Sequence, residues 1–266
     1  MHGNKRVTDK MVLARLDGLK APPGWREVHV SSDPKAKLQM IGFDSKARVQ
    51  RRYSAEFIAE KTEAKFVRVR KFGKDIGPAR VRIAKEAAAG RPEALLTRLE
   101  DKTAIRIGTD KDINAKVKAY GLTTLEGRHV TVRQGKFIDF DFIGKEGKRY
   151  TNTIQDSQLG AFIEARKKAA GSAGKLFPDV NDKKLNKYVK DTIGPYSVKD
   201  FRTYHATRIA HTELEAYATT TLTAKQKKAV VDDVLAKASG FLNNTPVMAK
   251  KSYIDPTVWQ MIGGID

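Results

Sequence analysis

The sequence has 266 residues, no cysteine and a formal net charge of +20, from 51 Lys and Arg against 31 Asp and Glu. This length allows one or two domains, because domains typically hold about 100–150 residues. The missing cysteines exclude disulfides, iron–sulfur clusters and cysteine-based zinc sites. The basic charge indicates a polyanionic partner, of which nucleic acid is the commonest and an anionic membrane surface the second.

No apolar run reaches the ~20 residues that a membrane-spanning helix needs, and charged residues interrupt Met1–Lys20 throughout. The sequence therefore predicts a soluble, intracellular protein without a membrane partner. In a bacterium or a phage-infected cell, we expect it in the cytoplasm or nucleoid.

The first segment predicts a small antiparallel β domain. Its expected strands are Glu27–Ser31, Leu38–Phe43 and Arg48–Tyr53, and turn-forming residues separate the first two. After Tyr53 the apolar spacing becomes helical, which places the domain boundary near residue 56. We therefore expect a β domain at residues 1–56 and a larger, mainly α domain at residues 57–266.

The second domain is predicted to contain a small sheet among helices, which makes the fold class α+β. Alternating residues indicate antiparallel strands at His129–Val132, Phe137–Ile143 and Tyr150–Ile154, with Lys145 at the turn between the last two. A later helix has a capping box at Thr223 and is expected to end just before Gly240.

Four separated stretches hold the residues suited to chemistry: Ala104–Gly108, Phe142–Lys145, Val198–Tyr204 and Asn244–Ile254. Taken alone, each stretch is weak evidence for a function. Arg106 could be a surface residue, and Lys145 could be a solvated turn residue. Arg202 could be the ion-pair partner of its neighbour Asp200, and Tyr253 a half-buried aromatic.

Taken together and in this order, the four stretches resemble the type IB DNA topoisomerases, especially the compact poxvirus and bacterial branch. The likeness extends from Pro22 to Ile254 and includes Tyr120–Leu125, Asp200–Tyr204 and Ser252–Pro256. The resemblance implies a catalytic domain of the tyrosine recombinase and topoisomerase IB type. It also implies a monomer whose two domains close around double-stranded DNA as a clamp.

The resemblance implies that Tyr253 is the nucleophile, that Arg106 and Arg202 bind the non-bridging phosphate oxygens, and that Lys145 is the general acid. A tyrosine hydroxyl, with a pKa of about 10, is a poor nucleophile at neutral pH, so cationic groups must offset the charge of the phosphodiester. The implied reaction is single-strand cleavage through a 3′-phosphotyrosyl bond, followed by strand rotation and religation. It uses no ATP and no metal, so no cofactor is expected.

Three positions deserve separate interpretation. Asn244 stands where poxvirus and eukaryotic relatives carry histidine; it can donate a neutral hydrogen bond to the phosphate, or it can simply turn the backbone. Lys199 stands where integrase-type recombinases usually carry histidine, which favours relaxation, and it is expected to contact the scissile phosphate or its neighbour. Gly108 either allows close approach to a phosphate or serves as a turn glycine.

The segment Lys46–Tyr53 resembles the β-domain segment that lies in the major groove in poxvirus enzymes. Arg48, Gln50 and Tyr53 match its DNA-contacting pattern, whereas Arg51 replaces a tyrosine. The stretch Phe66–Lys71 could form either a solvated amphipathic face or phosphate contacts.

The main alternative is a site-specific tyrosine recombinase or integrase, which shares the Arg–Lys–Arg–Tyr chemistry. Lys199, the β-type N-terminal segment and the lack of an obvious exchanged helix after Tyr253 argue against it. A non-catalytic DNA-packaging or RNA-binding protein is a third possibility, supported by net charge alone.

Overall fold

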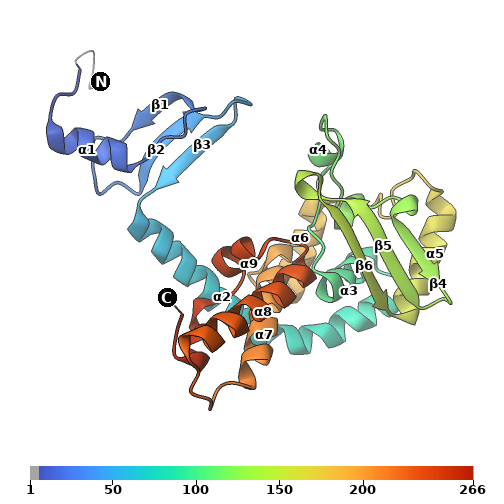
Figure 1. Ribbon diagram of the computed structural model, residues 1–266. Coiled ribbons are helices and arrows are strands. Elements are labelled where there is room, and N and C mark those ends of the chain that lie inside the picture. The colour runs from blue at the N-terminus through green and yellow to red at the C-terminus, as the bar shows by residue number, and fades with distance from the viewer. Residues whose placement is uncertain (1–5, 266) are drawn as a thin grey trace. The chain divides into compact units, whose positions relative to one another are not determined.

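The computed structural model describes residues 6–265 (Figure 1). The chain divides into two compact units between Val67 and Arg68, inside the long helix α2 (Ala55–Ala88). Each unit is described by itself below. The division by contacts falls within α2, and the functional domain boundary near residue 56 stays a prediction.

The first unit is a three-stranded antiparallel sheet in the order β1 (Arg26–Val30), β2 (Leu38–Phe43) and β3 (Val49–Tyr53). All three predicted strands are confirmed. The preceding helix α1 (Lys10–Gly18) was not predicted. Its first turn is capped by the Asp9 carboxylate, and Arg15 attaches the helix to the sheet by donating to the backbone oxygen of Ser31 at 2.9 Å.

The second unit combines helices with another three-stranded antiparallel sheet, and the predicted mixed class is confirmed. The sheet is formed by β4 (Val130–Arg133), β5 (Phe137–Ile143) and β6 (Arg149–Gln155). After α2 the helices are α3 (Pro92–Thr103), the single turn α4 (Asp110–Ile113), α5 (Ser157–Ala170), α6 (Asp182–Thr192), α7 (Val198–Glu215), α8 (Ala224–Leu242) and α9 (Pro246–Ser252). Short 3-10 turns lie at Leu122–Thr124, Gly127–His129, Lys145–Gly147 and Pro256–Ile262.

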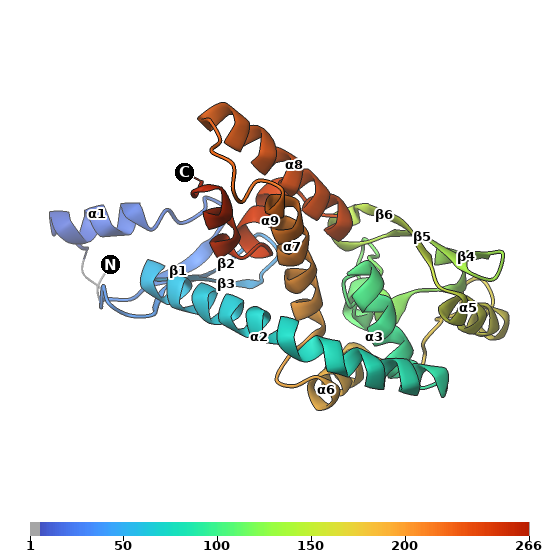
Figure 2. The same cartoon turned by 90° about the horizontal axis from the view of Figure 1, so that it is seen from below.

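Apolar and acidic side chains alternate along β5, as predicted, and this alternation determines which face of the sheet is buried. Ile138, Phe140 and Phe142 are buried, and helix α5 packs beside β4 and β5 (Figure 2). Asp139 and Asp141 face the other way, where they pair with arginines of the neighbouring strands. The Lys145 turn follows β5 directly, so the sheet sets the position of this turn.

The buried apolar residues of the second unit form two clusters. One lies among α2, α3, the sheet and α6, and the other among α7, α8, α9 and the Pro256–Ile262 turn. Helix α7 contributes to both, with Phe201 in the first cluster and Ala206 in the second. Arg202 is therefore placed on α7 where the two clusters meet.

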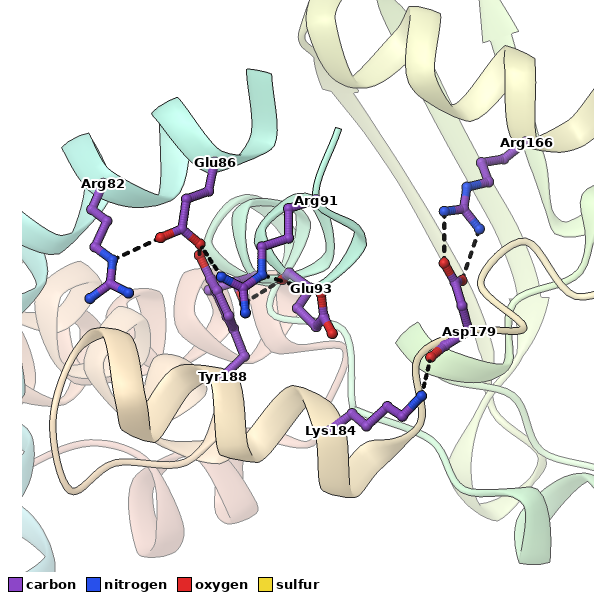
Figure 3. Close-up of polar contacts among 9 residues, drawn as sticks. Arg82, Glu86, Arg91, Glu93, Arg166, Asp179, Lys184 and Tyr188 are labelled. Carbon is purple, nitrogen blue, oxygen red and sulfur yellow. Dashed lines mark hydrogen bonds and ion pairs between the residues drawn. The ribbon is translucent and has the colours of Figure 1, made fainter. Parts of the chain in front are cut away.

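Polar contacts attach α6 to the neighbouring helices. The Glu86 carboxylate accepts from Arg82, Arg91 and the Tyr188 hydroxyl at 2.8, 2.9 and 2.9 Å, which joins α2, the start of α3 and α6 (Figure 3). Near the other end of α6, Arg166 pairs with Asp179 at 2.8 Å.

The predicted end of the Thr223-capped helix is wrong. Helix α8 continues past Gly240 to Leu242, and Asn243 takes the left-handed conformation, with φ 46°, that ends the helix. The Asn243 amide also donates to the backbone oxygen of Arg149 at 3.0 Å. The helix therefore ends where Asn243 makes this non-local contact, and not at the glycine that the local sequence pattern indicated. Among residues 6–265, no helix is both long and apolar enough to cross a membrane.

Candidate active site

Arg106 lies in the segment that follows α3, and a second segment holds it by backbone hydrogen bonds. The Leu122 amide donates to the Arg106 oxygen, and the Thr123 amide to the Ile107 oxygen, both at 2.8 Å. Gly108 has φ +74°, and a Cβ there would lie 2.9 Å from Gly121 Cα. The structure therefore gives Gly108 the role of a turn glycine, and its approach to a phosphate stays a prediction.

Arg202 is buried, with 3% of its surface exposed, and connects two helix ends. Its Nη1 donates to the backbone oxygen of Ala104, after α3, and its Nη2 to that of Leu242, at the end of α8, at 3.0 Å. The alternative in which Arg202 pairs with Asp200 is wrong, because Asp200 caps α7 and pairs with Arg68 at 2.9 Å.

Tyr253 ends helix α9, and only 9% of its surface is exposed. The Arg202 guanidinium carbon lies 5.2 Å from the centroid of the Tyr253 ring. The Thr207 hydroxyl on α7 fixes the backbone here, donating to the Tyr253 oxygen at 3.1 Å and accepting from the Asp255 amide at 3.0 Å. The Asp255 carboxylate in turn pairs with Arg70 at 2.6 Å.

Opposing effects act on the phenol. Burial raises the pKa of Tyr253, but the positive charges of Arg202, Arg106 and Lys199, together with hydrogen bonding from Arg202, bring it below the ordinary 10.0. For Arg106, burial and the nearby charge of Arg202 lower the pKa of the guanidinium. In the structure, the charges of these three predicted cationic residues therefore lower the pKa of Tyr253, the predicted nucleophile. A lowered pKa means more of the nucleophilic phenolate at neutral pH.

Lys145 lies at the turn between β5 and β6, as predicted. Its side chain is 66% exposed, and its Nζ is 4.0 Å from Glu146 Oε1. Lys145 lines one small recess together with Arg106 and Arg202, against the aromatic side chains of Tyr120 and Tyr150. The turn therefore places an ammonium group on a long, flexible side chain beside the two arginines that line the same recess.

Asn244 follows directly on the α8 cap. Its backbone amide donates to the Ser239 oxygen at 2.9 Å, and its side-chain oxygen accepts from the Thr245 amide at 3.0 Å. These contacts agree with the interpretation of Asn244 as a turn residue, and its contact with phosphate stays a prediction. Lys199 is exposed on the first turn of α7.

The predicted DNA-contacting residues of the first unit lie on β3 or directly before it, and they do not all face the same way. Arg48 and Gln50 hydrogen-bond the Asp44 carboxylate at 2.8 and 2.9 Å, and the bonds from Arg48 hold the pKa of Asp44 well below its usual value. Arg51 and Tyr53 alternate to the opposite face and are exposed.

Arg68 and Arg70, in the stretch expected to be either solvated or in contact with phosphate, have definite partners. They are half-exposed and pair with Asp200 and Asp255, the residues flanking the site on α7 and after Tyr253. Their role in holding the site was missed, because their acid partners are distant in sequence.

Sequence reasoning also missed Thr207 and the pair Asp101–His205. His205, one turn after Arg202, lies 3.0 Å from Asp101 through its Nε2, and Arg80 binds the same carboxylate at 2.7 and 2.9 Å. In the sequence, the block Tyr120–Leu125 carried the signal for the segment that holds Arg106. Over the described part of the chain, no group of three or more acidic or histidine side chains is arranged to hold a metal ion.

Two family models cover most of the chain. The model described as eukaryotic DNA topoisomerase I, catalytic core, matches residues 54–262, and the N-terminal domain of bacterial DNA topoisomerase IB matches residues 1–44. The first match contains all the predicted catalytic residues, and β3 falls between the two matches.

Individual relatives agree with these models. The chain is 29% identical to DNA topoisomerase 1B of Acanthamoeba polyphaga mimivirus, over 94% of this chain and 80% of that protein. DNA topoisomerase 1 of Daucus carota is 32% identical over 42% of this chain and 14% of its own length, and that of Schizosaccharomyces pombe is 32% identical over 44% and 14%. The chain therefore belongs to the type IB DNA topoisomerase family, isomerases that bind duplex DNA.

Proposed function

We propose that this chain relaxes supercoiled duplex DNA by cutting and rejoining one strand through Tyr253. The observation that carries this proposal is the buried Tyr253 phenol under the charges of Arg202, Arg106 and Lys199, which together lower its pKa. Such an arrangement suits attack on a phosphodiester, because the same cations offset the negative charge of the phosphate.

In the proposed reaction the Tyr253 oxygen forms a bond to the scissile phosphorus, and the bond from phosphorus to the 5′ oxygen breaks. The phenolic proton passes to solvent, and Lys145 gives a proton to the departing 5′ oxygen. Arg106 and Arg202 hold the non-bridging oxygens as charge develops on them. Religation is the reverse reaction, with the 5′ hydroxyl as nucleophile.

The phosphotyrosyl bond retains the free energy of the broken backbone bond, so religation needs no ATP. Between cleavage and religation, the downstream duplex can rotate and remove supercoils of either sign. Lys199 and Asn244 are proposed to contact the scissile phosphate or its neighbour, as secondary donors beside the two arginines.

The duplex is proposed to lie between an N-terminal DNA-binding domain, residues 1–56, and a catalytic domain, residues 57–266, in a monomer that clamps it. Arg48, Gln50, Arg51 and Tyr53 are proposed contacts of the first domain, and Gly108 a backbone contact of the second. Because β3 presents side chains on both faces, at most part of this set can meet one groove at the same time. We propose an intracellular location, where duplex DNA is present.

Plasmid relaxation tests the proposal. Supercoiled plasmid incubated with the protein, EDTA and no ATP should give a ladder of relaxed topoisomers. Tyr253→Phe should remove this activity and the covalent adduct while leaving DNA binding intact. Tyr188→Phe is the matched control, because it removes a hydroxyl bonded to Glu86 on another helix. Plasmid that stays supercoiled at every salt concentration tried would refute the proposal, and an adduct that forms only on paired specific sites would favour a recombinase.

A further inference from the structure

Helix α3 carries a buried acid that the proposed reaction does not use. Glu100 has no exposed surface and lies one turn before Ala104, whose backbone oxygen accepts from Arg202. In the described range, both carboxyl oxygens of Glu100 are without a hydrogen-bond partner, and so is the buried Nε of Arg202. Buried polar atoms without partners are rare in folded proteins, and two such groups beside the site require an explanation.

The carboxyl group of the next residue, Asp101, has a different environment from that of Glu100. Asp101 is bound by both Arg80 and His205, and although burial opposes it, these partners lower the pKa of Asp101 to about 2. No such donors reach Glu100 in the described structure. Adjacent carboxyls in opposite environments commonly have separate tasks.

A carboxylate that is fully buried without donors is costly, so such a group takes up a proton instead. Burial raises the pKa of Glu100 well above its ordinary value, even though the charge of Arg202 opposes this shift. The burial and the missing donors therefore both favour the neutral, protonated form of Glu100. A neutral acid leaves the positive charge of Arg202 uncancelled.

Arg202 has spare hydrogen-bonding capacity, and its charge acts on Glu100. Its two terminal nitrogens each bind one backbone oxygen, whereas a guanidinium carries more N–H donors than these two oxygens use. We propose that Glu100 is a positioning residue for Arg202, and that its buried carboxyl group accepts the free Arg202 Nε–H when the terminal nitrogens engage the scissile phosphate. This inference rests on the proposed function.

The arrangement would fix the guanidinium plane without weakening its charge. An ionised acid at the same place would neutralise Arg202 and reduce its attraction for both the phosphate and the Tyr253 phenolate. An apolar side chain would leave the Nε–H without a partner in the bound state. The prediction is therefore that position 100 needs a neutral acceptor, rather than a negative charge.

Two variants and a control separate these roles. Glu100→Gln keeps a neutral acceptor of the same length, and Glu100→Met removes it while filling a similar volume. Thr97→Val is the control, since it removes another buried hydroxyl of α3, one that bonds only the Glu93 backbone oxygen in the described structure. Single-turnover cleavage of a duplex, the dissociation constant for DNA and the thermal midpoint are measured for each.

The two Glu100 variants are expected to differ in their cleavage rates but not in their affinity for DNA. Glu100→Gln cleaves within about threefold of wild type, and Glu100→Met cleaves about ten- to one-hundred-fold more slowly, because it lacks one hydrogen bond to a charged group. DNA affinity should stay within about threefold, and the thermal midpoint of Glu100→Met should be unchanged or higher, since a buried unpartnered acid is gone. A residue with a merely structural role would not lose activity while keeping stability.

Several results would overturn the inference. One is a wild-type cleavage rate for Glu100→Met. Another is a tenfold slower rate for a folded Glu100→Gln, and this second result decides the question even if Glu100→Met does not fold. In the infrared difference spectrum of wild type minus Glu100→Gln at pH 7, a protonated-carboxyl band is expected, and a carboxylate signal alone overturns it. If wild type and Thr97→Val also fail to cleave, the proposed function itself is refuted, and this inference with it.

Discussion

Replacing Gly108 by alanine should damage both stability and catalysis through one displaced turn. The added Cβ would lie 2.7 Å from Thr124 Oγ1 and 2.9 Å from Gly121 Cα. Side-chain carbons do not approach backbone atoms this closely, so one segment must move. The partner segment has no room either, because a Cβ on Gly121 would lie 2.4 Å from the Arg106 oxygen.

The magnitude follows from two contributions. An alanine held at the φ of +74° of Gly108 costs about 1–2 kcal/mol in the left-handed region. Overpacking against Gly121 adds about 1–3 kcal/mol. The moved segment holds Arg106 through the Leu122 amide at 2.8 Å, and a displacement of about 1 Å in a catalytic group can cost about 10²-fold in rate.

Gly90→Ala provides the matched control. Gly90 also has a positive φ, +81°, but a Cβ there meets nothing within 4 Å. In urea unfolding, Gly90→Ala should lose about 1–2 kcal/mol and keep wild-type cleavage, whereas Gly108→Ala should lose about 2–5 kcal/mol and cleave about 10²-fold more slowly. Equal stabilities and equal cleavage rates for the two variants would show that the close approach of Gly108 to Gly121 does not control the position of Arg106.

The remaining predictions concern the supports of the site and its DNA. Asp101, whose pKa falls from 3.8 unfolded to about 2 folded, should contribute about 2 kcal/mol above pH 3.8 and lose it toward pH 2, so the unfolding difference from Asp101→Asn should shrink over that window. Thr207→Val removes the two hydrogen bonds to Tyr253 and Asp255, and urea unfolding should report a loss of about 1–3 kcal/mol, with slower cleavage. Asn244→Ala should slow single-turnover cleavage only modestly, and an unchanged rate would remove Asn244 from the site. Binding assays from 50 to 200 mM salt should show DNA affinity falling by about 10³-fold or more, whereas a salt-independent affinity would argue against a phosphate-tracking surface.

Local patterns were enough to predict both sheets. Alternation along Phe137–Ile143 predicted the buried face of β5 and the acids on its opposite face, and the glycines around Lys145 predicted the turn. These features depend on neighbours within a few residues. The four chemical stretches were also found in the sequence, because their residue types and order are distinctive.

Contacts between distant segments could not be predicted in this way. Arg202 binds the backbone oxygen of Leu242, the last residue of α8, and the helix ends there rather than before Gly240. Glu100 is an ordinary helix residue by propensity, and only packing removes it from water. Such relations require the three-dimensional arrangement of α3, α7 and α8.

The defining step of the proposed reaction is the covalent attachment of the DNA to Tyr253. It is tested most directly by denaturing a cleavage mixture, digesting the protein and the DNA, and identifying by mass spectrometry the peptide that bears a nucleotide. We expect a nucleotide joined through its 3′ phosphate to Tyr253, with a free 5′ hydroxyl on the other DNA end. An adduct on another residue, or one joined through a 5′ phosphate, would contradict it.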